Sequence, residues 1–464
     1  MTSKRVYEFD NEAYVLELQR LFIEDQDDPV GEVLDEANDT DSSEHIEERD
    51  GSSDSEQNDS DGSIASDNEN ENCYIALRKK NGKITDNYVW EKTPYNRRRR
   101  LEKQNILVRL PGVIGNARQA RGCLEIWQFL FDDTILNLIV TYTNQHKMSV
   151  QVNFSRDRDA RTTDLTEIKS FIGLLYLVGL YKGGRLNSEE LWDTEGNGVE
   201  IFRLTMGLKR FRFLFRSIRF DNRETRDERK NNDRLASIRE ICEMFVTNST
   251  KCYSLRANVT IDEKLEAFCR KCNFIQYIPS RPAKCGIEIF AFVDAKTYYT
   301  SNMEIYAGLQ PDGSYSMSNK SIDVVKRMIS PIYNTGGNVT MDNRFCDVSL
   351  LQDLSTNHKL FIIGTLKKNK WQIPNQLKIL KYRSIPFSMF GFRKEGTIVS
   401  YVPKKNEHVV LISSLHFDDK IDESTGDKMK PEIIPFYNVT KAGVDVVDKL
   451  CSSYNVARNT GYIL

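Results

Sequence analysis

The stretch Asn338-Val339-Thr340-Met341-Asp342-Asn343 contains β-branched residues, follows two glycines and ends beside a carboxylate. This pattern predicts a buried strand that holds an acid rigidly at the edge of a sheet. A near copy, Asn258-Val259-Thr260-Ile261-Asp262-Glu263, lies 80 residues earlier. A third acidic stretch, Gly443-Val444-Asp445-Val446-Val447-Asp448, has a helical pattern. Acids on two strands and a helix are one way to hold two divalent metal ions, which suggests in-line attack on a phosphodiester.

Charge is distributed unevenly along the 464-residue chain. The formal net charge is -2, but residues 1–72 carry 24 acidic and only 4 basic side chains. Residues 26–72 also have almost nothing to bury, so we expect an acidic, disordered tail. The remaining chain is basic, which indicates a polyanion partner for which the tail competes. A tail that only keeps the protein in solution explains the same composition.

Several classes of protein are not supported by the composition. No run approaches the ~18 apolar residues of a membrane span, so we expect no membrane partner. The N-terminus is charged from Lys4 onward, unlike a signal peptide. Nine scattered cysteines in a long chain indicate a reducing compartment. Cys269 and Cys272 form the only close pair and lack further ligands at zinc spacing.

Hydrophobic periodicity divides the basic body of the chain into two parts. Before residue 257, helical spacing predicts helices over 124–142, from 165 to the glycines at 183–184, and over 200–220 and 235–250, with a charged loop over 221–234. After it, strands are predicted over 258–268, 287–293, 297–307, 338–342 and 360–365, and helices over 321–333 and 347–356. This order predicts a mixed sheet with helices packed on it. Residues 368–430 are interpreted as a β-rich insertion.

Basic residues that could contact DNA occur in three places. Arg97–Arg100 form the densest cluster and fit an import signal, a phosphate-contacting arm or a solvated linker equally well. Lys209, Arg212, Arg216 and Arg219 are predicted to form a stripe beside an apolar stripe of one helix, which suits a DNA backbone or a solvated face. Lys367 and Lys368 follow the last strand of the predicted sheet.

With these patterns described, the chain resembles the piggyBac-type transposases and proteins derived from them, from about Pro111 to Val456. The matching motifs are Phe171-Ile172-Gly173-Leu174-Leu175-Tyr176, Ile201-Phe202-Arg203, Arg219-Phe220-Asp221, Val259-Thr260-Ile261-Asp262-Glu263, Tyr277-Ile278-Pro279-Ser280 with Pro282, Lys284 and Gly286, Thr340-Met341-Asp342-Asn343, Glu423-Ser424-Thr425-Gly426, and residues 437–448.

This resemblance implies an α/β fold with a ribonuclease H-like catalytic domain, a β-rich insertion and a preceding helical domain. The implied segments are an acidic tail at 1–72, a basic linker at 73–110, a helical dimerisation and DNA-binding domain at 111–256, the first part of the catalytic domain at 257–367, the insertion at 368–430, the last catalytic helix at 431–458 and a divergent end at 459–464. The implied activity is cut-and-paste transposition at TTAA sites in the nucleus, by a homodimer acting on double-stranded DNA. No small-molecule substrate is expected.

The implied catalytic and metal-binding acids fall on Asp262, Asp342 and Asp445, with Asp448 as a fourth, and Mg²⁺ is the implied cofactor, with Mn²⁺ as a substitute. In our hypothesis Asp262 and Asp342 bridge two ions, Asp445 holds one, and Asp448 orients Asp445 or binds through water. One ion activates a water and the other stabilises the departing 3′-oxygen. Glu263 either supports these acids or faces solvent, and the same two readings apply to Asn343. Lys284, inside a matching motif, is a further candidate DNA contact.

The chain departs from the family pattern at two places. Cys269 stands where the family has an Arg-like residue, and the chain stops at Leu464, soon after Asp448. Family members continue into further helices and a Cys-rich zinc module that reads the transposon ends, so we expect end recognition to be impaired. The alternatives are a catalytically inactive DNA- or chromatin-binding protein derived from a transposase, and a protein that binds a partner through its acidic tail.

Overall fold

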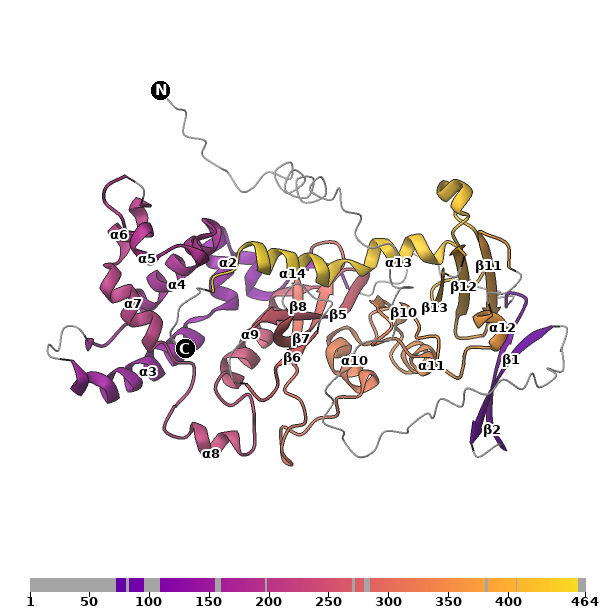
Figure 1. Cartoon of the computed structure of the whole chain (residues 1–464), viewed down its shortest axis with the longest axis horizontal. Helices are drawn as coiled ribbons and strands as arrows, with labels where there is room; N and C mark the ends of the chain where they lie inside the picture. Colours follow the sequence, from indigo (N-terminus) through magenta and orange to yellow (C-terminus); the bar gives the residue numbers. More distant parts are fainter. Residues whose placement is uncertain are drawn as a thin grey trace, which may run out of the picture.

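The computed structural model describes residues 72–80, 83–95, 109–154, 160–196, 198–268, 272–278, 284–379, 383–405 and 407–457. The predicted tail up to residue 71, the cluster Arg97–Arg100 and the divergent end at 459–464 lie outside these ranges. Figure 1 shows an elongated molecule with a helical part at one end, a mixed sheet in the middle and further strands at the other end.

Five strands form the centre of the sheet, in the order β8-β7-β5-β9-β10. Strands β5, β9 and β10 are parallel, whereas β7 is antiparallel to both of its neighbours, β5 and β8. The predicted mixed sheet is therefore confirmed, and so is the predicted order of its strands and helices. The bounds are Asn258–Ala267 (β5), Cys285–Asp294 (β7), Thr300–Ile305 (β8), Asn338–Met341 (β9) and Phe361–Thr365 (β10).

The predicted insertion continues this sheet. Strand β13 pairs with β10, and β12, β11, β2 and β1 follow in that order. The strands β11, β12 and β13 therefore extend the edge of the central sheet. The bounds are Cys73–Lys80 (β1), Lys83–Glu91 (β2), Phe387–Phe392 (β11), Thr397–Lys404 (β12) and Glu407–Ser413 (β13), with Gln276–Tyr277 (β6) on the other edge and Gly112–Val113 (β3) paired with Tyr253–Ser254 (β4).

The hairpin β1–β2 replaces part of the predicted linker at 73–110. Trp90 is fully buried and its Nε1 donates to the carbonyl of Gln372 at 3.0 Å. Glu91 lies opposite Phe392 in the sheet. The hairpin over 73–91 was not predicted, because the apolar side chains that bury Trp90 come from distant parts of the chain.

Helices cover both faces of the central sheet. Side chains alternate along each strand, so Val259, Ile261 and Met341 pack under α10 and α11, whereas Ala291 and Val293 pack under α14. Figure 1 shows α13 and α14 crossing one side of the sheet and α10 and α11 on the other. The bounds are Ser321–Ile329 (α10), Val348–Asn357 (α11), Asn375–Lys378 (α12), Ile433–Lys441 (α13) and Gly443–Ser453 (α14).

The helical part contains α2 to α9, and two of its predicted helices are broken. The predicted helix at 124–142 is split by Asp132, whose side chain caps α3 by accepting from the amide of Ile135. The predicted helix at 200–220 breaks after α6 and resumes at Leu208. Asp164 caps α4 by accepting from the amide of Glu167. The bounds are Cys123–Leu130 (α2), Asp133–Val150 (α3), Leu165–Leu180 (α4), Ser188–Leu191 (α5), Glu200–Thr205 (α6), Leu208–Ser217 (α7), Arg226–Lys230 (α8) and Arg239–Cys252 (α9).

The helical part contacts the sheet and the last helix at several places. Thr250 on α9 donates to the carbonyl of Ser301 on β8 at 2.9 Å. The segment after α14 returns to α4, where a Cβ on Gly179 would lie 2.5 Å from the carbonyl oxygen of Tyr454. Glycine is therefore required there for close packing. Within the described ranges, no helix has the length and apolarity needed to cross a membrane.

Lys147 on α3 carries an unusual charge inside the helical part. It is 1% exposed, and its Nζ has no hydrogen-bond partner among the described residues. Burial, reinforced by the nearby positive charge of Arg210, lowers the pKa of Lys147 to about 7. Between that value and 10.5 the unfolded chain binds more protons than the folded one. The destabilising effect of Lys147 is therefore largest below about pH 7 and decreases as the pH rises.

Lys147→Met is therefore expected to stabilise the protein at acidic to neutral pH by about 2 kcal/mol, because a packed apolar side chain replaces an unpaired buried charge. The gain should shrink as the pH approaches the ordinary pKa of lysine. Urea unfolding of both proteins at about pH 6 and about pH 10 measures it. An equal gain at both pH values would contradict the assigned shift.

Candidate active site

The two similar stretches found in the sequence lie side by side in the sheet. Parallel pairing places Asn258 opposite Asn338 and continues in register to Ile261 opposite Met341. Asp262 and Asp342 are the next residues on the two strands, so both acids emerge together where β9 ends. The two similar stretches, 80 residues apart, thus place two carboxylates side by side: Asp342 directly after β9, and Asp262 midway along the longer strand β5.

A third carboxylate joins these two. Oxygen atoms of Asp262, Glu263 and Asp342 all lie within 4.8 Å of one another, and the three residues are half-buried. Burial raises the pKa of Asp262 well above its ordinary value, and the negative charges of Glu263, Asp342 and Asp445 raise it further. Three crowded oxygen donors fit a hard divalent cation, because such an ion would remove the mutual repulsion.

Asp445 approaches this cluster from the first turn of α14. The hydroxyl of Thr260 donates to the backbone carbonyl of Thr440 at 2.6 Å. The hydroxyl of Thr340 donates to the side-chain hydroxyl of Thr440 at 2.8 Å. Gly443 then lies so close to β5 that a Cβ there would be 2.8 Å from Thr260 Oγ1. These contacts fix the start of α14 against β5 and β9, and thereby fix the position from which Asp445 acts on Asp262.

Two cations border the acidic cluster. Arg344 forms an ion pair with the buried Glu288 and lies 3.9 Å from Glu263. Lys264, 6% exposed, contacts Glu266 at 3.0 Å and Asp448 at 3.9 Å. Asp448 is therefore placed beside a lysine of β5, while Asp445, one helical turn earlier, is the acid whose charge acts on Asp262.

The predicted DNA contacts have different surroundings. Lys367 and Lys368 are exposed and follow β10 at the edge where the parallel strands β5 and β9 present their acids. Lys284 is exposed just before β7. The sequence does not show which of these lysines faces the acids, because that depends on how the strands pair.

The predicted basic stripe on α7 needs correction. Lys209 is exposed, but Arg212 forms an ion pair with Glu189 at 3.1 Å. Arg216 donates to the carbonyl of Arg212 at 3.2 Å. Arg219 lies beyond the end of α7 at Ser217, so it does not belong to the stripe at all. The error arose because the helical spacing was extended past Ser217, where α7 ends.

Comparisons with known proteins agree with this architecture. A sequence profile of the family described as Transposase IS4 matches residues 123–461. The cryo-EM structure of a piggyBac transposase synaptic complex with hairpin DNA is 32% identical to this chain, with a TM-score of 0.70, and the match covers 76% of this chain and 73% of that chain. The fold and the acidic site thus define a transposase of the broader family that the profile describes. Within it, the chain belongs to the piggyBac-type transposases.

Sequence reasoning left three features of the site undecided or unnoticed. The place of Glu263 in the cluster was one of two open alternatives. Arg344 and Lys264 were not singled out, because an isolated basic residue beside an acid is common on protein surfaces. Thr440 and Gly443 belong to the motif at 437–448, but no local signal in that motif indicates that they contact Thr260.

Proposed function

We propose that this protein cuts and rejoins DNA strands as a metal-dependent transposase-like enzyme. The observation that carries the proposal is the side-by-side placement of Asp262 and Asp342 where β9 ends, with Glu263 in the same cluster and Asp445 near enough to act on Asp262. Carboxylates crowd in this way where they share a cation, because without one they repel each other.

We infer that β8-β7-β5-β9-β10 is a ribonuclease H-like sheet. The basis is the order of these five strands and the direction of β7, which alone among them runs antiparallel to the others. Hard oxygen donors favour Mg²⁺, for which Mn²⁺ substitutes. When bound, a pair of such ions supplies an activated water and charge stabilisation at the departing oxygen. The residues proposed to hold them are Asp262, Asp342 and Asp445.

The protein's own contribution is position and charge balance. Asp262 and Asp342 are held rigidly because they continue buried, paired strands. Asp448 supports Asp445 indirectly, since its contact with Lys264 fastens the same face of α14 to β5. Arg344 offsets part of the negative charge by pairing with Glu288, which leaves Glu263 and the aspartates to act on the cation.

The proposed substrate is double-stranded DNA, which the exposed Lys367, Lys368 and Lys284 would approach along its phosphates. The solved relative is a synaptic complex with hairpin DNA, which supports this choice. Cleavage at TTAA sites, action as a homodimer and a nuclear location are parts of the same proposal.

A second candidate function is DNA binding without cleavage. The observation that favours it is Arg344, whose positive charge lies 3.9 Å from Glu263 and offsets part of the negative charge of the acidic cluster without a metal ion. A protein of this kind would retain the fold and the DNA-binding surface and would use neither Asp262 nor Asp342 chemically.

Nicking of supercoiled plasmid by the full chain with Mg²⁺ or Mn²⁺ separates the two functions. The first predicts relaxed and linear products that require the metal and disappear in Asp342→Asn. The second predicts salt-sensitive binding with no products. Nicking that persists in Asp342→Asn would refute the proposed site, because no strand cleavage should survive loss of a bridging acid.

A further inference from the structure

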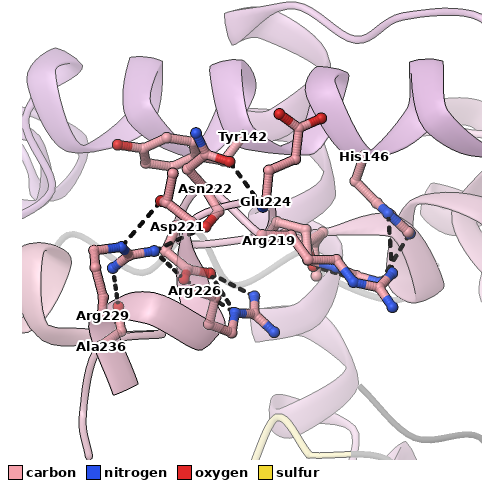
Figure 2. A network of polar contacts seen from close by, with 12 residues as sticks. Tyr142, His146, Arg219, Asp221, Asn222, Glu224, Arg226, Arg229 and Ala236 are labelled. Carbon is pink, nitrogen blue, oxygen red and sulfur yellow. Dashed lines mark hydrogen bonds and ion pairs between the residues drawn. The ribbon is translucent and has the colours of Figure 1, made fainter. Parts of the chain in front are cut away.

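A second charged site lies in the helical part, far along the chain from the acidic cluster. Arg219, Arg223, Arg226 and Arg229 follow α7 and form what we call the arginine cluster. This segment was predicted to be a charged loop, but it contains α8 and a dense set of contacts. Figure 2 shows Arg226 and Arg229 gathered around Asp221, and Arg219 reaching toward His146 on the neighbouring helix α3.

Two members of the cluster hold the segment together. The Asp221 side chain is 4% exposed and accepts from Arg226 through two guanidinium nitrogens and from Arg229 at 2.6 Å. Arg229 also donates to the carbonyl of Ala236 at 2.7 Å. These charge-assisted contacts make the segment rigid. One carboxylate nevertheless offsets only one of the two positive charges.

The other two members are held by neutral groups. Arg219 donates to the carbonyls of Arg216 at 3.0 Å and Ile218 at 2.7 Å, and its Nη2 lies 2.8 Å from His146 Nε2. Arg223 reaches the other ring nitrogen, Nδ1, at 3.5 Å. Burial and the surrounding arginines lower the pKa of His146 to about 4, so the ring is neutral near pH 7.

The cluster therefore keeps its positive charge. Within the described ranges neither Arg219 nor Arg223 forms an ion pair, whereas Arg210 and Arg212 on α7 are paired with Glu167 and Glu189. Burial and the charges of Arg223 and Arg226 lower the pKa of Arg219, and the negative charge of Asp221 opposes this shift. Preorganised guanidinium groups that form no ion pair within the described ranges are suited to an anion with several oxygens.

We propose that the arginine cluster binds backbone phosphates of duplex DNA, with Arg219 and Arg223 as the contacting groups and Asp221 and His146 as positioning residues. The inference rests on the proposed function, because that function supplies the partner. It places a DNA contact beyond the end of α7 instead of along its predicted stripe. Both guanidinium groups contact the same imidazole ring, so they lie close enough together to engage one stretch of backbone.

The test is binding of the full chain to a short fluorescent duplex of arbitrary sequence, measured by anisotropy over a range of salt concentrations. Arg223→Ala removes an exposed side chain with one weak protein contact, so the fold should persist, which circular dichroism checks. We expect roughly a 3- to 10-fold loss of affinity and a salt slope smaller by about one. Arg203→Ala is the matched control: Arg203 is exposed and pairs with Glu200 on α6, at the opposite end of the helical part from α8 (Figure 1).

The outcomes distinguish this inference from the proposed function. A lower affinity and a smaller salt slope in Arg223→Ala, with an unchanged control, support the arginine cluster. Salt-dependent binding by the wild type that is the same in Arg223→Ala overturns the cluster and leaves the proposed function standing. A wild type that binds no DNA at any salt concentration overturns both.

Discussion

Asp262→Asn is expected to abolish metal-dependent strand cleavage, with a loss on the order of 10³-fold or more, and at the same time to stabilise the metal-free protein. The loss follows because Asp262 is the acid whose charge interacts with Glu263, Asp342 and Asp445 together. The gain follows because an amide of the same size removes one charge from a cluster in which like charges repel. Plasmid nicking measures the first effect, and thermal unfolding in EDTA measures the second.

The same variant has a predictable pH dependence. The pKa of Asp262 in the folded state is raised above 3.8, so the folded protein binds more protons than the unfolded chain above that pH. The metal-free wild type should therefore lose stability as the pH rises from about 4 through the raised pKa, whereas Asp262→Asn should not. Mg²⁺ should stabilise the wild type by mass action and leave the variant nearly unchanged.

Asp312→Asn serves as the control, because Asp312 is an exposed acid in a loop. It should alter neither nicking nor the response to Mg²⁺. Equal stabilisation of the wild type and of Asp262→Asn by Mg²⁺ would show that the ion binds elsewhere, and the proposed centre would have to be abandoned.

How much of this site the sequence predicts depends on whether a signal is local. The strands that carry Asp262 and Asp342 were predictable, because each begins with its own β-branched run that leads to an acid. That they pair in register is not a local property, although the identical Asn-Val-Thr spacing suggested equivalence. The environment of Glu263 was left open because alternation along a strand does not say how far a long side chain bends toward its neighbours.

The errors have a common physical origin. Trp90 is buried by a strand about 300 residues away in the chain (Phe392 lies opposite Glu91), so no local pattern could predict its place in the sheet. The charged segment after α7 resembled a solvated loop, because the sequence does not show that one buried aspartate, Asp221, gathers two arginines. Composition predicts which residues carry charge, whereas only the fold decides which of those charges are compensated.

Gly443→Ala is expected to lower strand cleavage by about 10²-fold, although the substitution lies outside the acidic cluster. The new Cβ would meet Thr260 Oγ1 at 2.8 Å and Thr260 Cβ at 3.1 Å. Thr260 cannot move aside freely, because its hydroxyl is buried and donates to the carbonyl of Thr440. The start of α14 must therefore shift away from β5, which displaces Asp445 from Asp262. The cost in stability should be about 1–3 kcal/mol.

Gly173→Ala on α4 is the matched control, because a Cβ there meets nothing within 4 Å. Alanine is the better helix former by about 1 kcal/mol, so this variant should be more stable than the wild type and equally active. The two glycine substitutions should change stability in opposite directions, which separates the effect of the contact with Thr260 from the effect of helix propensity. Adding Thr260→Ala to Gly443→Ala removes the closest clash and should restore part of the lost activity. If Gly443→Ala alone cleaves DNA as fast as the wild type, the position of α14 does not control Asp445, and Asp445 would have to act without a fixed helix.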